Sequence, residues 1–460
     1  MKPMTLARLA SLCAGRVLGD GETVVDGIAS DTRKLPVTGL ASPLFVALEG
    51  ASFDGHAHVA AAAERGAVAA LVSREVAAGI AQIVVADTER ALADIARALQ
   101  AARAGKVLAI TGSNGKTSVK TLLLSILGQA GGAYANPGNF NNEIGLPLSV
   151  IAAPEDARFY VYEMGAGKPG DIAYLTAIVT PEVSLVNNVA PAHLARMGSL
   201  LAIAETKAAV YDDLAAGGTA VINADDAYGR YFESRAAGRR VLRFALEASA
   251  EVSAAEVVLD AGGSRFRLRT PAGDAGIRLH LPGRHNVANA LAAAAMALAV
   301  GVDIEHVRRG LESARPVPGR LAVRRLACGA RLIDDSYNAN PGSLAAAIDT
   351  LASVEGEGEG WLVLGEMREL GVDEVGLHAE AGHRAKAAGI ARLYAIGALA
   401  GAAAEAFGDG ARRFDSHAEL AGALRGELRE GVRVLVKGSR GSAMDRVVAA
   451  LLAGENADAA

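Results

Sequence analysis

The chain has 460 residues, which is too long for a single hydrophobic core and predicts two or three domains. Its formal net charge of -5 gives no general attraction to nucleic acid or to an anionic membrane surface, so local groups must hold any anionic ligand. The cysteines are Cys13 and Cys328 alone, which argues against a disulfide or zinc framework and favours the cytoplasm.

Residues 1–86 alternate short apolar runs with helical patterns, and they predict a small α/β domain. The first helix follows a capping Thr5, and the charges of Arg8 and Arg16 argue against a signal segment. The longest apolar run, residues 290–300, is much shorter than the roughly 20 residues of a bilayer span. No membrane span is expected.

Residues 87–316 predict a second domain, in which apolar strands alternate with helices after a leading helix at 88–103. Such strands indicate a doubly wound parallel sheet, whose ligands gather at the carboxyl ends of the strands. Period-two alternation around residues 250–280 predicts an antiparallel hairpin. A proline-rich hinge then leads to a third, Rossmann-like βα series at 317–460.

The segment "ITGSNGKTSVKTLL" at 110–123 joins a predicted strand to a predicted helix through a glycine-rich turn. The backbone amides of such a turn and the following helix N-terminus bind phosphate, to which Lys116 adds a charge and Thr117 a hydroxyl for Mg²⁺. The alternative is a purely structural turn. The nucleotide-binding candidates are Gly112, Ser113, Asn114, Gly115, Lys116, Thr117 and Ser118.

Further polar residues follow later strands and helices of this domain. Glu163 ends an apolar strand, where its carboxylate would complete a Mg²⁺ site beside the loop. His193 follows the next strand and Lys207 lies in a helix; taken singly, they are more typical of a structural histidine and a solvated lysine. Asn286 and Asn289 share one helix face, which suits either an adenine edge or helix capping.

These motifs together resemble the Mur ligases, the ATP-dependent amide-forming enzymes that build the peptidoglycan stem peptide. The resemblance covers nearly the whole chain. It rests on the order of "TGSNGKT", "EMG", "NNVAPAHL", "ETKAAVY", "GRHNVANALAA", "PGR" and "DDSYNANP". Within the family, residues 138–151, 334–343, 364–371 and 435–444 resemble the member that adds D-alanyl-D-alanine to UDP-N-acetylmuramoyl-tripeptide. The Asp-Asn-Pro-Arg motif of the diaminopimelate-adding sibling is not found in the sequence.

The resemblance implies that ATP phosphorylates the tripeptide carboxylate and that the dipeptide amine attacks the acyl phosphate. It implies the partners UDP-N-acetylmuramoyl-tripeptide and D-alanyl-D-alanine. We expect a monomer that binds no nucleic acid, although the sequence itself leaves the oligomeric state open. It leaves open whether diaminopimelate or lysine is the third residue of the stem.

The resemblance also assigns roles to individual residues. Lys116 would hold the β- and γ-phosphates, Thr117 and Glu163 one Mg²⁺, and His193 with a carbamylated Lys207 a second. Asn286 and Asn289 would face the adenine, while Arg320 and Asp335 would close over the nucleotide. The substrate-binding candidates are Ser30, Arg33 and Gly50 for the UDP group, Asn139, Asn141 and Asn142 for the sugar-peptide, and Asn338, Asn340, Lys437, Ser439 and Arg440 for the dipeptide.

Other functions stay open on the sequence alone. A P-loop ATPase coupling hydrolysis to motion needs only the loop and Glu163, but it leaves Lys207 and the predicted helix of the "GRHNVANA" segment within 281–295 unexplained. A sibling Mur ligase that adds one amino acid, a nucleotide-sensing module and a folate polyglutamate ligase are further alternatives. The last of these has no counterpart of the first domain.

Overall fold

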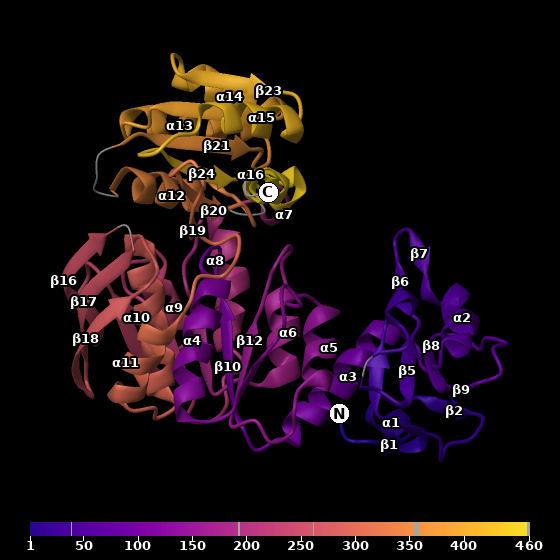
Figure 1. The fold of residues 1–460 in the computed structure, drawn as a ribbon. Helices are drawn as coiled ribbons and strands as arrows, with labels where there is room; N and C mark the ends of the chain where they lie inside the picture. Colours follow the sequence, from indigo (N-terminus) through magenta and orange to yellow (C-terminus); the bar gives the residue numbers. More distant parts are fainter. Residues whose placement is uncertain (38, 192–193, 261, 354–357, 458–460) are drawn as a thin grey trace.

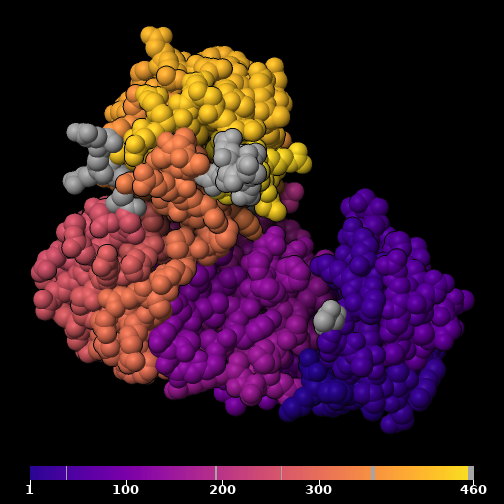
Figure 2. All heavy atoms as spheres, in the orientation of Figure 1, coloured from indigo at the N-terminus to yellow at the C-terminus, as the bar shows by residue number. Residues whose placement is uncertain are grey.

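A computed structural model describes residues 1–37, 39–191, 194–260, 262–353 and 358–457. The chain forms three lobes, with the first and third lobes each placed against a different side of the central lobe (Figure 1). The space-filling view leaves open space between the first and third lobes (Figure 2). Each lobe is built around one main sheet, and the expected three-part α/β architecture is confirmed.

The first lobe contains a five-stranded sheet with helices packed on it. The strands are mostly parallel, and only the edge strand β2 runs antiparallel to its neighbour. In spatial order they are β2 (Arg16–Leu18), β9 (Ala81–Val84), β8 (Ala69–Val72), β5 (Pro43–Val46) and β4 (Gly27–Ala29). Short strands β1 (Met4–Thr5) and β3 (Val24–Val25) pair with each other, as do β6 (Glu49–Gly50) and β7 (Phe53–Asp54).

The central lobe contains a nine-stranded sheet that is parallel over its first part and ends in an antiparallel meander. In order its strands are β11 (Ala133–Ala135), β12 (Phe159–Glu163), β10 (Lys106–Thr111), β13 (Val183–Val186), β14 (Thr219–Asn223), β15 (Arg240–Ala245), β16 (Val252–Asp260), β17 (Gly263–Thr270) and β18 (Gly273–Leu279). The hairpin expected near residues 250–280 is thus β17 and β18, extended by β16. Strand β10 lies between two strands that follow it in the chain, so the strand order reverses beside its carboxyl end, where ligands of doubly wound sheets bind.

The third lobe contains a six-stranded sheet that is parallel except for its edge strand. Its order is β19 (Ala322–Arg325), β20 (Arg331–Asp335), β24 (Arg433–Lys437), β21 (Gly360–Gly365), β22 (Arg392–Ile396) and β23 (Ala411–Phe414). Apolar cores lie on both faces of this sheet, as expected for a parallel sheet covered by helices on both sides.

Helices cover both faces of the central sheet. One face carries α4, α10 and α11, and the other carries α5 and α6. The helices are α1 (Leu6–Leu12), α2 (Val59–Glu64), α3 (Thr88–Ala101), α4 (Lys116–Ala130), α5 (Gly145–Ala152), α6 (Asp171–Val179), α7 (Leu194–Met197), α8 (Leu200–Ala208), α9 (Gly229–Arg235), α10 (Arg284–Ala299), α11 (Ile304–Ser313), α12 (Pro341–Ser353), α13 (Glu374–Ala387), α14 (Ala398–Phe407), α15 (His417–Glu427) and α16 (Asp445–Ala457).

Helix α3 joins the first lobe to the central lobe. Asp87 caps its N-terminus by accepting hydrogen bonds from two backbone amides, and its buried face packs against α1, α5 and α6. The division into domains 1–86, 87–316 and 317–460 stays a prediction. The main sheet of the first lobe ends at Val84, that of the central lobe begins at Lys106, and that of the third lobe begins at Ala322. Within the described residues, no helix combines the length and apolar character needed to cross a membrane.

Candidate active site

A cavity of about 710 Å³ lies at the carboxyl ends of β10 and β12, between the central and third lobes. It brings together most of the residues that the sequence singled out. Those in its wall are Gly112, Ser113, Asn114, Gly115, Lys116, Thr117, Ser118, Asn139, Asn141, Asn142, Glu163, Lys207, Asn286, Asn289, Arg320, Asp335, Asn338, Asn340, Lys437 and Arg440. Ser439 is buried nearby and is not part of this wall.

The glycine-rich loop connects β10 directly to α4, which begins at Lys116. The Lys116 ammonium donates to the backbone carbonyls of Gly112, at 2.6 Å, and Ser113, at 3.4 Å. Burial lowers the pKa of Lys116, and the nearby Arg320 adds to this, while Glu163 opposes it. Within the described residues, the hydrogen-bond partners of the ammonium are therefore neutral carbonyls, which a phosphate could replace.

Gly115 precedes α4 with a left-handed backbone, at a φ of 78°. A Cβ atom there would lie 2.5 Å from the side-chain amides of both Asn187 and Asn289. The position thus requires glycine for its conformation and for the close approach of these amides. The two amides bond to each other at 3.0 Å, and Asn187 also donates to the carbonyl of Asn114.

Asn286 and Asn289 are buried on α10 and continue this amide chain. Asn289 donates to the Asn286 side chain at 3.2 Å, and Asn286 donates to the Pro282 carbonyl at 2.7 Å. Asn286 and Asn289 are thus connected to the phosphate loop through Asn187, which bonds to the Asn114 carbonyl. Contact with adenine remains a prediction for both.

Glu163 ends β12 and is 3% exposed. Its carboxylate accepts hydrogen bonds from Thr117, at 3.0 Å, and Asn141, at 2.9 Å, and lies 3.1 Å from the Lys120 ammonium. Burial alone raises the pKa of Glu163, but Lys120 and Lys116 outweigh it and hold that pKa below its ordinary value. The carboxylate is therefore ionised beside the Thr117 hydroxyl, and these are the hard oxygen ligands that Mg²⁺ prefers.

Lys207, on α8, is 4% exposed and lies in the cavity wall. Its ammonium group has no hydrogen bond or ion pair with any residue that the structure describes. Burial lowers the pKa of Lys207 well below its ordinary value, and the charge of Lys116 lowers it further. The side chain is therefore readily available as a neutral amine, which is the form that reacts with CO₂. His193, its predicted companion, lies outside the described residues.

The third lobe reaches the loop through two side chains. Arg320 donates to the Thr117 hydroxyl at 3.1 Å and stacks 4.3 Å from the centre of the Tyr337 ring. Asn340, just before α12, donates to the Asn114 side chain at 2.7 Å. The loop of the central lobe and the start of the third lobe are therefore already in contact.

Asp335 and Lys437 form a buried pair at the ends of adjacent strands β20 and β24, with 2.5 Å between Oδ2 and Nζ. Lys437 also donates to the carbonyl of Asn338 at 2.9 Å. Burial raises the pKa of Asp335, and the Lys437 ammonium opposes this rise. Of the predicted dipeptide residues, Lys437 is therefore part of this ion pair and Asn338 is bonded to it.

The predicted UDP residues Ser30, Arg33 and Gly50 do not line the cavity formed by the described residues. Arg33 is exposed and pairs with Asp31 at 2.9 Å. The same loop nevertheless reaches the central lobe, because the Lys34 ammonium lies 5.7 Å from the centre of the Phe140 ring. Phe140 belongs to the loop that carries the three predicted sugar-peptide asparagines.

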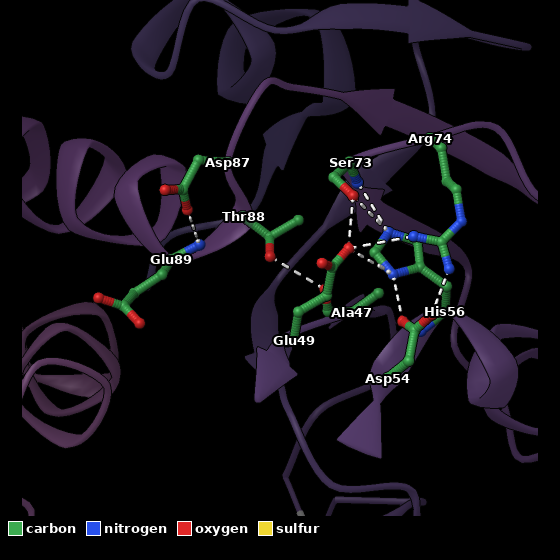
Figure 3. Close-up of polar contacts among 9 residues, drawn as sticks. All are labelled: Ala47, Glu49, Asp54, His56, Ser73, Arg74, Asp87, Thr88 and Glu89. Carbon is green, nitrogen blue, oxygen red and sulfur yellow. Dashed lines mark hydrogen bonds and ion pairs between the residues drawn. The ribbon is translucent and has the colours of Figure 1, made fainter. Parts of the chain in front are cut away.

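A polar network occupies the next segment of the first lobe (Figure 3). His56 bonds through Nδ1 to Asp54, at 2.7 Å, and its Nε2 accepts the backbone N–H of Ser73, at 2.8 Å. Arg74 pairs with Asp54 and, at 3.1 Å, with Glu49. Although Glu49, Asp54 and His56 are close enough to hold a metal ion, both ring nitrogens and both carboxylates have protein partners. The network is best explained as a brace for the hairpin of β6 and β7.

Several residues that shape the cavity were not predicted. Asn136 holds the end of β12 by accepting the backbone N–H of Glu163 and donating to its carbonyl. The Lys120 ammonium lies beside the Glu163 carboxylate, and His285 lies in the cavity wall. The sequence signal that could have found Asn136 is its place in the asparagine-rich segment 136–142, whereas nothing in the sequence distinguishes Lys120 from other lysines in helices. Further unpredicted wall residues are Glu143, Lys168, Asp171, Asn187, Asn188, Arg196, Asn223 and Tyr337.

Comparison with known proteins identifies the family. Residues 110–297 match the Mur ligase middle domain, and residues 319–440 match the Mur ligase, glutamate ligase domain. The chain is 39% identical to UDP-N-acetylmuramoyl-tripeptide--D-alanyl-D-alanine ligase of Escherichia coli strain K12, over 98% of this chain and 99% of that protein.

Two solved structures are similar over nearly their whole length. One is the UDP-N-acetylmuramoylalanyl-D-glutamyl-2,6-diaminopimelate--D-alanyl-D-alanyl ligase of Acinetobacter baumannii, with a TM-score of 0.89 at 32% identity, covering 98% of this chain and 99% of that one. The other is MurF ligase from Thermotoga maritima in complex with ADP, with a TM-score of 0.82 at 27% identity, covering 94% and 98%. The chain belongs to the Mur ligase family.

Proposed function

We propose that this protein is the ATP-dependent, ADP-forming ligase that joins D-alanyl-D-alanine to UDP-N-acetylmuramoyl-tripeptide in peptidoglycan synthesis. The observation that carries the proposal is the single cavity in which the phosphate loop faces the Asp335–Lys437 pair across two lobes. Full-length similarity to ligases of that name supports the choice of substrates. The alternative function, a P-loop ATPase that drives motion, does not explain why the Asp335–Lys437 pair faces the phosphate loop.

The reaction needs an activated carboxyl group, because a free carboxylate is a poor electrophile. A carboxylate oxygen of the tripeptide attacks the γ-phosphorus of ATP, and ADP leaves. The neutral amine of the dipeptide then attacks the carbonyl carbon of the acyl phosphate, inorganic phosphate leaves, and the amine loses a proton. Lys116 and the loop amides would hold the phosphate oxygens as charge shifts between them, while Arg320 would neutralise charge from the opposite side.

Mg²⁺ fits the corner formed by Thr117 and Glu163, where an ionised carboxylate and a hydroxyl already lie within 3.0 Å of each other. Mg²⁺ would neutralise phosphate charge and help to align the nucleotide. We propose that Lys207 is carbamylated and provides oxygen ligands for a second Mg²⁺, together with His193. The amine of Lys207 is buried and has no partner among the described residues, which supports this, because a carbamate needs a neutral lysine and a cationic one would repel the metal.

The remaining assignments are kept as proposals. Asn139, Asn141 and Asn142 would contact the sugar-peptide, Ser30, Arg33 and Gly50 the UDP group, and Asn338, Asn340, Ser439 and Arg440 the dipeptide. The cytoplasm is the proposed compartment, since ATP is supplied there and Cys13 and Cys328 are both free thiols.

Phosphate release provides the test. With ATP and Mg²⁺ we expect release only when UDP-N-acetylmuramoyl-tripeptide and D-alanyl-D-alanine are both present, with one dipeptide joined per phosphate by mass spectrometry. Rapid release with ATP alone would favour the ATPase. Equal use of a single amino acid, such as diaminopimelate with a UDP-dipeptide acceptor, would favour a sibling ligase.

A further inference from the structure

A second, smaller cavity of about 170 Å³ adjoins the active-site cavity. The two share Glu143, Gly165, Lys168 and Asp171 in their walls. The far side of the smaller cavity is closed by Tyr174 of α6 and by Glu89 of α3, the helix that links the first lobe to the central lobe. A side chain that starts at the reaction centre can therefore extend toward the first lobe.

Three of the four charged side chains in the wall of this cavity have no partner in the part of the chain that the structure describes. Among the described residues, the side chains of Glu89, Glu143 and Lys168 make no hydrogen bond and no ion pair within 4.0 Å. Figure 3 shows the Glu89 carboxylate directed away from the network around His56. Asp171 differs, since it accepts the backbone amides of Gly167, at 2.8 Å, and Lys168, at 3.0 Å. Two carboxylates and one ammonium are thus free to meet a ligand.

The hydroxyl of Tyr174 is a second, independent sign of a ligand. It is buried and has no hydrogen-bond partner in the described part of the chain, and such a group costs free energy unless something else satisfies it. Burial, followed by the neighbouring charge of Glu143, raises the pKa of Glu89. A cation placed between the carboxylates would relieve this repulsion and could donate to the tyrosine oxygen.

We propose that the smaller cavity binds the side-chain ammonium group of the third residue of the UDP-linked tripeptide. This inference rests on the proposed function and names the part of the substrate that the cavity selects. A monoamine of the length of lysine would meet Glu89, Glu143 and the oxygen of Tyr174. The zwitterionic end of 2,6-diaminopimelate, a component of the substrate in the name of the similar Acinetobacter ligase, would also meet Lys168.

The test uses the complete enzyme and three UDP-tripeptides, whose third residue is lysine, diaminopimelate or norleucine. Norleucine keeps the aliphatic chain of lysine and lacks its ammonium group. We expect kcat/KM for the better of the two amine substrates to exceed that for norleucine by roughly 10- to 100-fold, the range of a charge-assisted hydrogen bond. The ratio should fall toward one in Glu89→Gln and Glu143→Gln. Glu64→Gln, at an exposed position on α2 of the first lobe, should keep the wild-type ratio.

Two further variants separate binding from folding. Tyr174→Phe should reduce the ratio while leaving the thermal midpoint unchanged or slightly raised, because it removes an unsatisfied hydroxyl. If the zwitterion is the natural ligand, Lys168→Met should lower kcat/KM for the diaminopimelate tripeptide only. If this variant keeps the wild-type kcat/KM for both the diaminopimelate and the lysine tripeptide, the natural ligand is the monoamine.

If the wild-type enzyme is active and its kcat/KM for the norleucine tripeptide equals that for both amine tripeptides, the inference is overturned and the proposed function stays intact. Ratios that survive both glutamate substitutions would overturn it as well. Absence of ligation with every tripeptide would instead contradict the proposed function.

Discussion

Among the residues that the structure describes, Lys116 bonds to neutral carbonyls alone, so its removal should affect catalysis much more than stability. The Lys116→Ala variant is expected to lose at least about 100-fold in kcat, because the lost charge would stabilise the transferring phosphate in a site shielded from water. Its thermal midpoint should stay close to that of the wild type. Lys106→Ala, at the exposed start of β10, the strand that precedes the loop, is the matched control. A large fall in the midpoint with turnover retained would contradict the assignment.

Lys207 provides a chemical test of the carbamate. The Lys207→Ala variant should lose most activity, and acetate or propionate should restore part of it by supplying oxygen atoms in the vacated space. The same carboxylates should not rescue Lys116→Ala. Full activity of Lys207→Ala would contradict the carbamate role. So would a density map of the metal-bound wild type that shows an unmodified Lys207 amine.

His285 links the stability of the site to pH. Burial, with a smaller contribution from Lys437, lowers the pKa of His285 to about 4 from its ordinary 6.5. The unfolded chain therefore takes up a proton between pH 6.5 and 4 that the folded chain does not, and the contribution of this group to stability is lost as pH falls through that window.

The thermal midpoint of the ligand-free wild type should consequently drop more between pH 6.5 and 4 than that of His285→Gln. His58→Gln, at an exposed position in the first lobe, should follow the wild type. If the thermal midpoints of the wild type and His285→Gln fall in parallel as pH decreases, His285 does not contribute to the pH dependence of stability.

At the scale of elements, α11 and α4 approach each other closely at Gly310. A Cβ atom at this position would lie 2.3 Å from the Cα of Ile126, and Ser125 donates to the Gly310 carbonyl at 2.7 Å. The Gly310→Ala variant should be destabilised by about 1–3 kcal/mol, because overpacking outweighs the roughly 1 kcal/mol that alanine gains in a helix.

Gly422 gives the opposite expectation. It is exposed on α15 and no atom would meet a Cβ there, so Gly422→Ala should be stabilised by up to about 1 kcal/mol. Denaturant unfolding of both variants measures the contrast. Equal effects of the two substitutions would mean that the helices can separate without cost.

Local patterns predicted the elements well where sequence periodicity alone determines them. Period-two alternation gave the hairpin of β17 and β18, and the apolar runs before Gly112 and Glu163 gave β10 and β12. The attachment of the hairpin to the main sheet was not predictable, because β15 and β16 pair through only Phe244 with Val252 and Ala245 with Ser253. Such pairing depends on packing and leaves no local pattern.

The site shows the same division. Lys116 and Thr117 were predictable because a phosphate loop is a contiguous sequence motif. Asn136 and Lys120 were not, since their contacts with Glu163 join segments that are distant in sequence. The bonding of Asn187 to Asn289 likewise exists only once β13 and α10 are packed together.

At the scale of the whole molecule, the two contacts between the third lobe and the phosphate loop use groups that ATP would need. The Thr117 hydroxyl accepts from Arg320, and the Asn114 side chain accepts from Asn340. Nucleotide binding should therefore replace these contacts. Since phosphoryl transfer also requires exclusion of water from a cavity of about 710 Å³, we expect the third lobe to rotate about the linker 314–320 and close over the bound ligands.

Solution scattering measures this closure. The radius of gyration should decrease when an ATP analogue and UDP-N-acetylmuramoyl-tripeptide are both bound, and less when either is bound alone. Arg320→Met should show a smaller decrease at saturating ligand, because it removes the cation that would draw the third lobe toward the phosphates. Arg324→Met, at an exposed position on β19, should behave as the wild type. An unchanged radius with both ligands demonstrably bound would mean that the lobes are already in their catalytic arrangement, with the Arg320 and Asn340 side chains alone changing partners.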